Sequence, residues 1–267
     1  MSLLFNFLFP PPPSIFITAM SVISFASLAN AGYSEFKGKH LQYSKFWNTS
    51  SQKAVEKKKE IKISSRNGML ILYVPAFLAG VLALGIYPND GFRFMLVDFA
   101  LTLHFFKRVF EVLFVHKYSG GMVLDSVIPI SLSYTISTAT MIYNQHLTHT
   151  LPEPSLDFKY AGVALFLLST IGNFYHHTIL AKLREKDDKG YKIPKGGLFN
   201  ILICPHYLFE ILAFVGICFI SQTIYPICFT AGTAIYLTGR SYATRRWYLS
   251  KFPDFPKDVK ALIPFVF

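Results

Sequence analysis

The chain has 267 residues, of which 52% are hydrophobic and only 15% are charged, whereas soluble domains carry about 25% charged residues. This composition, with a mean hydropathy of +0.38, indicates a membrane protein and excludes an ordinary soluble domain. The net charge of +11 does not predict a nucleic-acid partner, because the basic residues lie in loops between apolar runs, where the anionic headgroups of a cytoplasmic leaflet attract them.

Seven apolar runs predict membrane-spanning helices, each of which needs about 20 mostly apolar residues. In chain order they cover roughly residues 14–32, 69–87, 94–115, 122–143, 159–181, 199–221 and 224–240. The last two are so close that a tight turn around residues 222–224 must join them. The first run ends in small residues that mimic a signal-peptide cleavage site, but no basic residue precedes it, so we expect a retained first span. The sequence therefore predicts an all-α polytopic membrane protein, a bundle of about seven transmembrane helices forming a single membrane domain over residues 1–267.

The basic residues predict the orientation of these spans. When seven spans alternate in direction, all of the 26 lysines and arginines except Arg93 and Lys159 fall on one side. The largest group lies in the loop of residues 34–67. We therefore expect this side and the C-terminus to be cytosolic and the N-terminus to be lumenal. Asn48 begins a formal glycosylation sequon inside the basic loop, and we expect it to stay unmodified.

Three of the predicted spans carry polar side chains at helical spacing, so that each set shares one helix face. The sets are His104, Arg108 and Glu111; Asn173, His177 and Arg184; and His206 and Glu210. Because ionisable groups inside a span are costly, they indicate a functional site. We interpret the three faces as the lining of one cavity open toward the cytosol, and its arginines suit an anionic, phosphate-bearing ligand. The alternative is that these groups are interhelical hydrogen bonds that hold the bundle together.

Several other kinds of site are not indicated. The chain contains neither GxGxxG after a strand nor GxxxxGK[ST], the motifs of soluble nucleotide-binding folds. The pairs His146/His149 and His176/His177 are similar to histidine boxes of membrane di-iron enzymes, but they fall at different predicted depths, so we expect no metal. The three cysteines cannot complete a disulfide framework, and we expect thiols without a redox or metal role.

Several segments together resemble the steroid 5α-reductase and trans-2-enoyl-CoA reductase family. They are HFFKRVFEVLFVHKYSGG (residues 104–121), the later islands LREKDDKGYKIPKGGLF, CPHYLFE, RRWYLSKF and KALIPFVF, and GYSEFKGKH after the first span. The resemblance implies a seven-helix protein of the endoplasmic reticulum membrane that uses NADPH to reduce a carbon–carbon double bond conjugated to a carbonyl. Its substrate would be a lipid entering from the bilayer. Residues 1–115 would form the N-terminal spans with their basic cytosolic loop, and residues 116–267 a reductase-like region that binds NADPH.

The polar faces and the family motifs together assign residues to cofactor contact. They are Arg108, Asn173, His177, Arg184, Tyr191, Lys192, His206, Tyr207, Glu210, Arg245 and Tyr248. Two of them depart from the family pattern, in which an asparagine is usual at the position of His206 and a histidine at that of Arg245.

The resemblance also implies a departure at the catalytic pair. Where the family has a carbonyl-binding tyrosine this chain has Phe105, and where it has the partner glutamate this chain has Tyr73. Reduction of the conjugated bond needs a donor on the carbonyl oxygen, where negative charge develops. Phenylalanine cannot donate a hydrogen bond, so our hypothesis is that Tyr73 or His104 supplies the donor.

The substrate is the least determined feature. IPKGGLF and KALIPFVF resemble the steroid branch, which favours a 3-oxo-Δ4-steroid, whereas VFEVLFVHKYSGG resembles the enoyl-CoA reductase branch of very-long-chain fatty acid elongation and the polyprenol branch. Two other classes stay open. A seven-span receptor fits the predicted orientation, and a non-catalytic membrane subunit would account for the replacements at Tyr73 and Phe105.

Overall fold

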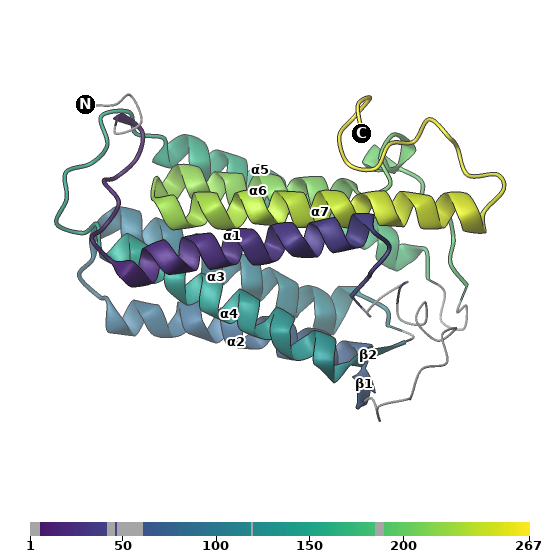
Figure 1. The fold of residues 1–267 in the computed structure, drawn as a ribbon, viewed down its shortest axis with the longest axis horizontal. Coiled ribbons are helices and arrows are strands. Elements are labelled where there is room, and N and C mark those ends of the chain that lie inside the picture. Colours follow the sequence, from purple (N-terminus) through teal and green to yellow (C-terminus); the bar gives the residue numbers. More distant parts are fainter. Residues whose placement is uncertain (1–5, 42–45, 47–60, 119, 185–189) are drawn as a thin grey trace.

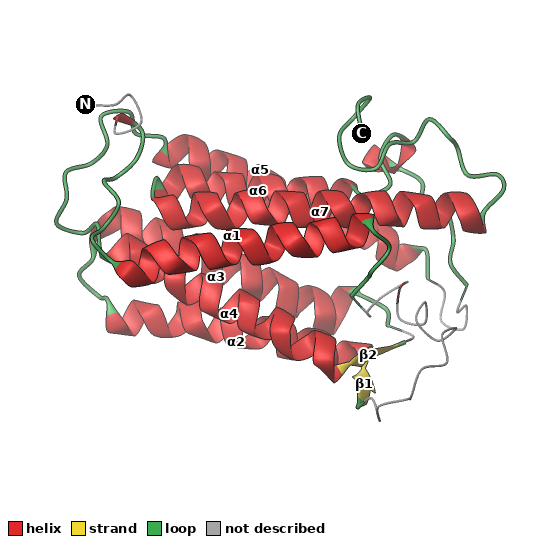
Figure 2. Ribbon diagram, in the orientation of Figure 1, coloured by secondary structure: helices red, strands yellow, loops and turns green. Residues whose placement is uncertain are grey.

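The computed structural model is an elongated bundle of helices lying side by side (Figures 1 and 2). It describes residues 6–41, 46, 61–118, 120–184 and 190–267. Within these residues the long helices are α1 (Ile15–Phe36), α2 (Ser65–Ile86), α3 (Gly91–Phe110), α4 (Leu124–His146), α5 (Lys159–Lys182), α6 (Pro205–Ser221) and α7 (Ile224–Lys251). Successive helices run in opposite directions, so the loops alternate between the two ends of the bundle.

The helices confirm the predicted all-α membrane class. Three of those described, α1, α2 and α5, are long and apolar enough to cross a membrane, and α6 is a shorter apolar helix. Gln222 adopts a left-handed conformation with φ of 49° between α6 and α7, which is the tight turn expected there. The described chain contains no disulfide.

Two predicted boundaries differ from the structure. The helix expected from residue 199 begins at Pro205, because Gly196 and Gly197 have φ of 94° and 52° and lead into a short 3₁₀ turn over Gly197–Asn200. Proline is favoured in the first turn, where its missing N–H would have no partner. The last helix continues past residue 240 to Lys251, since a polar sequence can stay helical beyond the apolar run that hydropathy detects.

A small antiparallel sheet joins two segments at the end of the bundle that carries the basic loops. Strand β1 (Lys62–Ser64) pairs with β2 (Gly121–Val123), with Lys62 opposite Val123. A π-helical turn, Glu111–Val115, lies between α3 and this sheet. The pairing ties the segment before α2 to the segment that follows the π-helical turn.

Close backbone contact holds α1 against α7, although they are far apart in the sequence (Figure 1). A Cβ added to Gly239 would lie 2.3 Å from the carbonyl oxygen of Gly32, so only glycine fits there. Next to this contact, α7 and α1 are joined by a buried ion pair in which Arg240 Nη1 donates to Glu35 Oε1 at 2.7 Å. His40 Nδ1 lies 2.5 Å from the other oxygen of Glu35.

The opposite end of the bundle is closed around Arg93, one of the two basic residues expected there. Its guanidinium donates to Glu153 Oε2 at 2.7 Å, to Asp157 Oδ1 at 2.6 Å and to the carbonyl of Ile220 at 2.6 Å. Burial acts against ionisation of Asp157, but hydrogen bonds from Lys159 and Arg93 lower its pKa to about 2. Both basic residues at this end are therefore neutralised by acidic neighbours.

Candidate functional site

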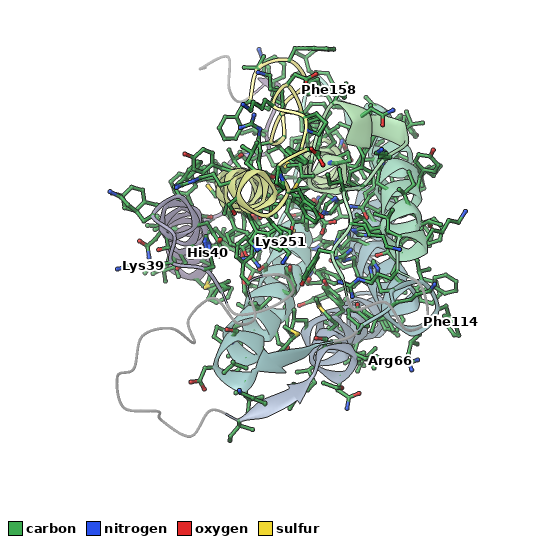
Figure 3. The ribbon with its side chains drawn as sticks, turned by 90° about the vertical axis from the view of Figure 1, so that its right-hand side faces the viewer. Lys39, His40, Arg66, Phe114, Phe158 and Lys251 are labelled. Carbon is green, nitrogen blue, oxygen red and sulfur yellow. The ribbon has the colours of Figure 1, made fainter. Side chains whose placement is uncertain are left out.

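A network of buried and half-buried polar side chains connects α2, α3, α5 and α6 toward the end with the basic loops. Figure 3 looks onto this end, where Arg66, Phe114 and Lys251 are labelled. We call the network, which consists of Tyr73, His104, Lys107, Arg108, Glu111, Asn173, His177 and Glu210, the central network.

Glu111 is the acidic centre of this network and is 0% exposed. Its Oε1 accepts from Lys107 Nζ at 3.0 Å and lies 2.9 Å from His177 Nδ1, and its Oε2 accepts from Arg108 Nη1 at 3.0 Å. The residue opens the π-helical turn after α3, and such turns re-aim side chains at functional sites. One carboxylate thus gathers two cations from α3 and a histidine from α5.

Asn173 connects α3 to α6. Its Oδ1 accepts from Lys107 Nζ, and its Nδ2 donates to Glu210 Oε2 at 3.0 Å and to the carbonyl of His206 at 2.7 Å. Glu210 Oε1 in turn lies 3.5 Å from His104 Nε2. A single amide on α5 therefore joins a lysine of α3 to a carboxylate and a backbone carbonyl of α6.

Tyr73 joins the network from α2. Arg108 Nη2 donates to its phenol oxygen at 2.7 Å, and the guanidinium carbon lies 4.8 Å from the centre of its ring. The ring stacks on Tyr134, with centroids 5.7 Å apart, and Tyr134 also meets Phe105 at 5.6 Å. The phenol is consequently held by a cation at the edge of an aromatic cluster.

Most members of the three polar faces meet in this network, which agrees both with the cavity interpretation and with its alternative, interhelical hydrogen bonds that hold the bundle together. His206 lies at the edge of the network, with its ring 5.4 Å from that of His177. Arg184 lies further out, where Nη1 donates to the carbonyl of Lys117 at 2.6 Å and the guanidinium carbon is 6.0 Å from the ring of Tyr191.

The remaining residues assigned to the cofactor form an outer group near Arg184. Tyr191 makes an edge contact with Trp247 at 4.8 Å, the phenol of Tyr248 donates to the carbonyl of Lys192 at 3.3 Å, and Tyr207 packs against the same apolar cluster as Tyr248. Arg245 has a different environment. Its Nε and Nη2 each donate at 2.6 Å to backbone carbonyls of the C-terminal tail, those of Val259 and Lys257, so this side chain holds the tail in place. The motif-based assignment of Arg245 to the cofactor stays a prediction.

Sequence reasoning missed two residues of this region. The sequence predicts Lys107 only as one of the basic residues on the cytosolic side, yet the structure leaves it 7% exposed. Its position four residues before Glu111 was the signal for an ion pair on one helix face. His116 was not singled out at all. Burial and the neighbouring His177 and Arg108 lower its pKa to about 3, so that it is neutral at pH 7.

One set of side chains in the described residues has metal-ligand spacing. Atoms of Glu111, His116 and His177 lie within 4.8 Å of one another. However, Lys107 and Arg108 already donate to the two oxygens of Glu111. Two cations at hydrogen-bond distance oppose the binding of a third, so the donor set suits an ion-pair network better than a metal. The expectation of no metal stays a prediction.

Comparison with known proteins identifies one family. The family described as 3-oxo-5-alpha-steroid 4-dehydrogenase matches residues 127–267, more than half of the chain. A very-long-chain enoyl-CoA reductase of Dictyostelium discoideum is 29% identical over 201 residues, covering 74% of this chain and 67% of that protein. A probable very-long-chain enoyl-CoA reductase of Caenorhabditis elegans is 28% identical over 200 residues, 72% of this chain and 64% of its own length. A steroid 5-alpha-reductase of Gossypium hirsutum is 40% identical over 108 residues, 40% of this chain and 42% of that protein.

The family match covers only part of the candidate site. The family match contains Asn173, His177, Glu210 and the outer group, whereas Tyr73 and the α3 residues of the central network precede it. The aligned part of this chain spans about two thirds or less of the length of these relatives.

Proposed function

Because the chain belongs to the 3-oxo-5-alpha-steroid 4-dehydrogenase family, we propose that it is a membrane-embedded NADPH-dependent reductase. It reduces a carbon–carbon double bond conjugated to a carbonyl in a lipid that enters from the bilayer. The observation that carries this proposal is the central network, in which Arg108 donates to the phenol of Tyr73 while Arg108 and Lys107 both pair with Glu111. The names of the relatives, which are reductases, support the same class of reaction.

The side chains present fit a phosphate-bearing dinucleotide. Arg108 Nε is buried without a hydrogen-bond partner among the described residues, which leaves a charged donor for an anionic group. The outer group nearer the basic loops combines positive charge with aromatic faces, so it would hold the phosphate and adenine end of the cofactor. Its members are Arg184, Tyr191, Lys192, Tyr207 and Tyr248. Asn173, His177, His206 and Glu210 would hold the nicotinamide end. When bound, NADPH supplies the hydride to the β carbon.

The geometry around Tyr73 supports its role as the oxyanion donor. A phenol oxygen that accepts a hydrogen bond from a guanidinium becomes a stronger donor through its own hydrogen, and Arg108 makes that bond at 2.7 Å. Arg108 is itself held by Glu111 at 3.0 Å, so the donor is oriented before the substrate arrives. Preorganised donors of this kind stabilise the negative charge that develops on the carbonyl oxygen. His104, paired with Glu210, is the alternative donor.

A 3-oxo-Δ4-steroid is the substrate that we propose first, since the family carries that description. A trans-2-enoyl-CoA is the second candidate. The specific observation that favours it is the length of similarity, which extends over 200 and 201 residues for the two enoyl-CoA reductases but over 108 for the steroid 5-alpha-reductase.

The decisive experiment compares two tyrosine variants of the purified protein. With NADPH and a panel of 3-oxo-Δ4-steroids and enoyl-CoAs, the wild type should oxidise the cofactor, followed as loss of absorbance of the reduced nicotinamide. Tyr73→Phe should abolish turnover and keep cofactor binding. Tyr134→Phe removes the neighbouring phenol of the same aromatic cluster and should keep turnover. If the wild type binds NADPH but oxidises it with none of the substrates, the protein is instead a non-catalytic subunit. Normal turnover by Tyr73→Phe would assign the donor role to His104.

The location that we propose is the endoplasmic reticulum membrane, with the C-terminus in the cytosol. The alternation of helix direction supports this orientation, because it puts the basic loops at one end of the bundle. Asn48 lies outside the described residues, and its sequon should stay unmodified in microsomes. A sequon introduced into the loop of residues 147–156, at the other end, should be glycosylated. Modification of Asn48 would reverse the assignment.

A further inference from the structure

His176 is a buried residue of α5 that the proposed mechanism does not use. It immediately precedes His177 of the central network and is 3% exposed. Its ring stacks on Phe209 of α6, with centroids 5.3 Å apart, and meets the edge of Phe199 at 5.5 Å. The ring of Phe199 lies in turn 6.1 Å from that of His206. A buried imidazole needs hydrogen-bond partners for its nitrogens, because unpaired polar atoms inside a protein are costly.

The partners of His176 fix which of its nitrogens carries the hydrogen. Nδ1 lies 2.7 Å from the carbonyl oxygen of Gly172, one turn earlier in α5, and Nε2 accepts from the backbone N–H of Leu198 at 3.1 Å. A carbonyl can only accept and a backbone N–H can only donate, so the hydrogen is on Nδ1 and the lone pair is on Nε2. The side chain therefore joins α5 to residues 190–204, which we call the α5–α6 segment.

The backbone of the α5–α6 segment is shaped to reach this ring. Gly197 has φ of 52°, and a Cβ added to it would lie 2.9 Å from His176 Nε2 and 2.9 Å from Tyr175 Cε1. Only glycine combines this conformation with so close an approach. The carbonyl of Leu198 then accepts from the N–H of Leu202 at 2.8 Å, so the turn that contacts His176 continues toward the start of α6.

The contact lies between the two parts of the proposed cofactor site, at the end of the bundle that carries the basic loops (Figure 1). On α5, His176 adjoins His177 of the central network. Within the α5–α6 segment, Lys192 belongs to the outer group, and its carbonyl accepts from the phenol of Tyr248 at 3.3 Å. The segment is therefore held by α7 at Lys192 and by α5 at Leu198.

We propose, on the basis of the reductase function above, that His176 is a positioning residue for NADPH. It does not touch the cofactor. Its Nε2 holds Leu198 and so fixes the α5–α6 segment before NADPH arrives, with the outer group on one side and the central network on the other. A segment that is ordered in advance costs less to order on binding, which increases affinity. Loss of the acceptor should therefore weaken NADPH binding and leave hydride transfer in the bound complex little changed.

Three substitutions of His176 move or remove the acceptor. In His176→Gln the side-chain oxygen can occupy the place of Nε2, because both atoms are the same number of bonds from Cα. The oxygen in His176→Asn reaches only the place of Nδ1, and His176→Phe keeps an aromatic ring without any acceptor. His149→Phe is the control, since His149 is exposed and lies in the loop at the opposite end of the bundle.

The first measurement is the dissociation constant of NADPH, obtained by titration of the purified protein. It should rise about five- to tenfold in His176→Asn and His176→Phe, the effect of one hydrogen bond left unmade. His176→Gln and His149→Phe should stay within about twofold of the wild type. In all of the variants, kcat at saturating NADPH and the KM for the lipid should change by less than about twofold, because the groups that contact the substrate are unaltered.

The second measurement is hydrogen exchange of the ligand-free protein, which tests the contact without cofactor or substrate. The amide of Leu198 should exchange faster in His176→Asn and His176→Phe than in the wild type, because its hydrogen bond is lost. It should exchange at the wild-type rate in His176→Gln. A role limited to general stability would instead lower kcat and raise the KM for the lipid together with the dissociation constant of NADPH.

The inference is overturned if His176→Gln and His176→Asn show the same NADPH affinity, or if kcat and both substrate constants change in parallel. Failure of the reductase proposal has a different signature. In that case the wild type binds NADPH and oxidises it with no lipid, while the glutamine variant still binds NADPH more tightly than the asparagine variant. A wild type that binds no NADPH would overturn both proposals.

Discussion

The central network predicts that the charge of Glu111 stabilises the fold. In Glu111→Gln the side chain keeps its shape but loses the charge that faces Lys107 at 3.0 Å, Arg108 at 3.0 Å and His177 at 2.9 Å. Removing one partner of a buried ion pair costs about 3 to 5 kcal/mol, because the other charge stays buried and uncompensated. A glutamine still accepts one hydrogen bond, so we expect Glu111→Gln to lower the free energy of unfolding by about 3 kcal/mol, the low end of this range.

The magnitude gives a measurable change in thermal stability. For proteins of 150–250 residues, 1 kcal/mol shifts the thermal midpoint by about 2 to 4 °C, so the midpoint of Glu111→Gln in detergent should fall by roughly 6 to 12 °C. Glu153→Gln is the matched control, because its side chain is 52% exposed although it also pairs with an arginine. Arg93 is buried but keeps Asp157 as a partner when Glu153 loses its charge. A pair with one exposed member contributes about 0 to 1 kcal/mol, so the control should change little.

A double variant separates charge from shape. Once Glu111 has lost its charge, the positive charge of Lys107 stays buried without compensation and destabilises the fold. The double variant Lys107→Gln/Glu111→Gln should therefore lose about 1 to 3 kcal/mol less free energy of unfolding than the two single variants lose in sum. The reasoning is refuted if the two costs simply add, or if Glu111→Gln shifts the midpoint no more than Glu153→Gln does.

Two further predictions concern stability. The pKa of His116 is lowered from 6.5 to about 3, so the unfolded chain takes up a proton below pH 6.5 that the folded chain refuses, and stability should decline from about pH 6.5 toward pH 3. The free energy of unfolding should fall by on the order of 1 to 2 kcal/mol by pH 5. In thermal unfolding, His116→Phe should lose less stability between pH 7 and pH 5 than the wild type does. An identical decline in both proteins would contradict the assignment. A side chain at Gly239 would collide with the backbone of Gly32, so Gly239→Ala should lower the thermal midpoint by several degrees, whereas Gly85→Ala, with open space around its added Cβ, should not. Equal midpoints for these two variants would show that the α1–α7 contact adapts at little cost.

The sequence by itself determined the fold class and most of the candidate site. The lengths of the apolar runs predict helices because the thickness of the bilayer sets the length of a span. Helical spacing placed His104, Arg108 and Glu111 on one face and Asn173 and His177 on another, and the structure brings these faces together. Both inferences depend only on local periodicity, which the order of residues contains.

Only the tertiary structure decided which groups are partners and which are buried. Lys107 lies at the polar end of an apolar run, where hydropathy predicts exposure, but the packing of α5 against α3 buries it on Asn173. The link between Tyr73 and Arg108, and that between His176 and Leu198, likewise depend on how neighbouring elements are rotated and aligned. Contacts between segments that are tens of residues apart arise from the mutual fit of many side chains, so no local pattern in the chain reveals them.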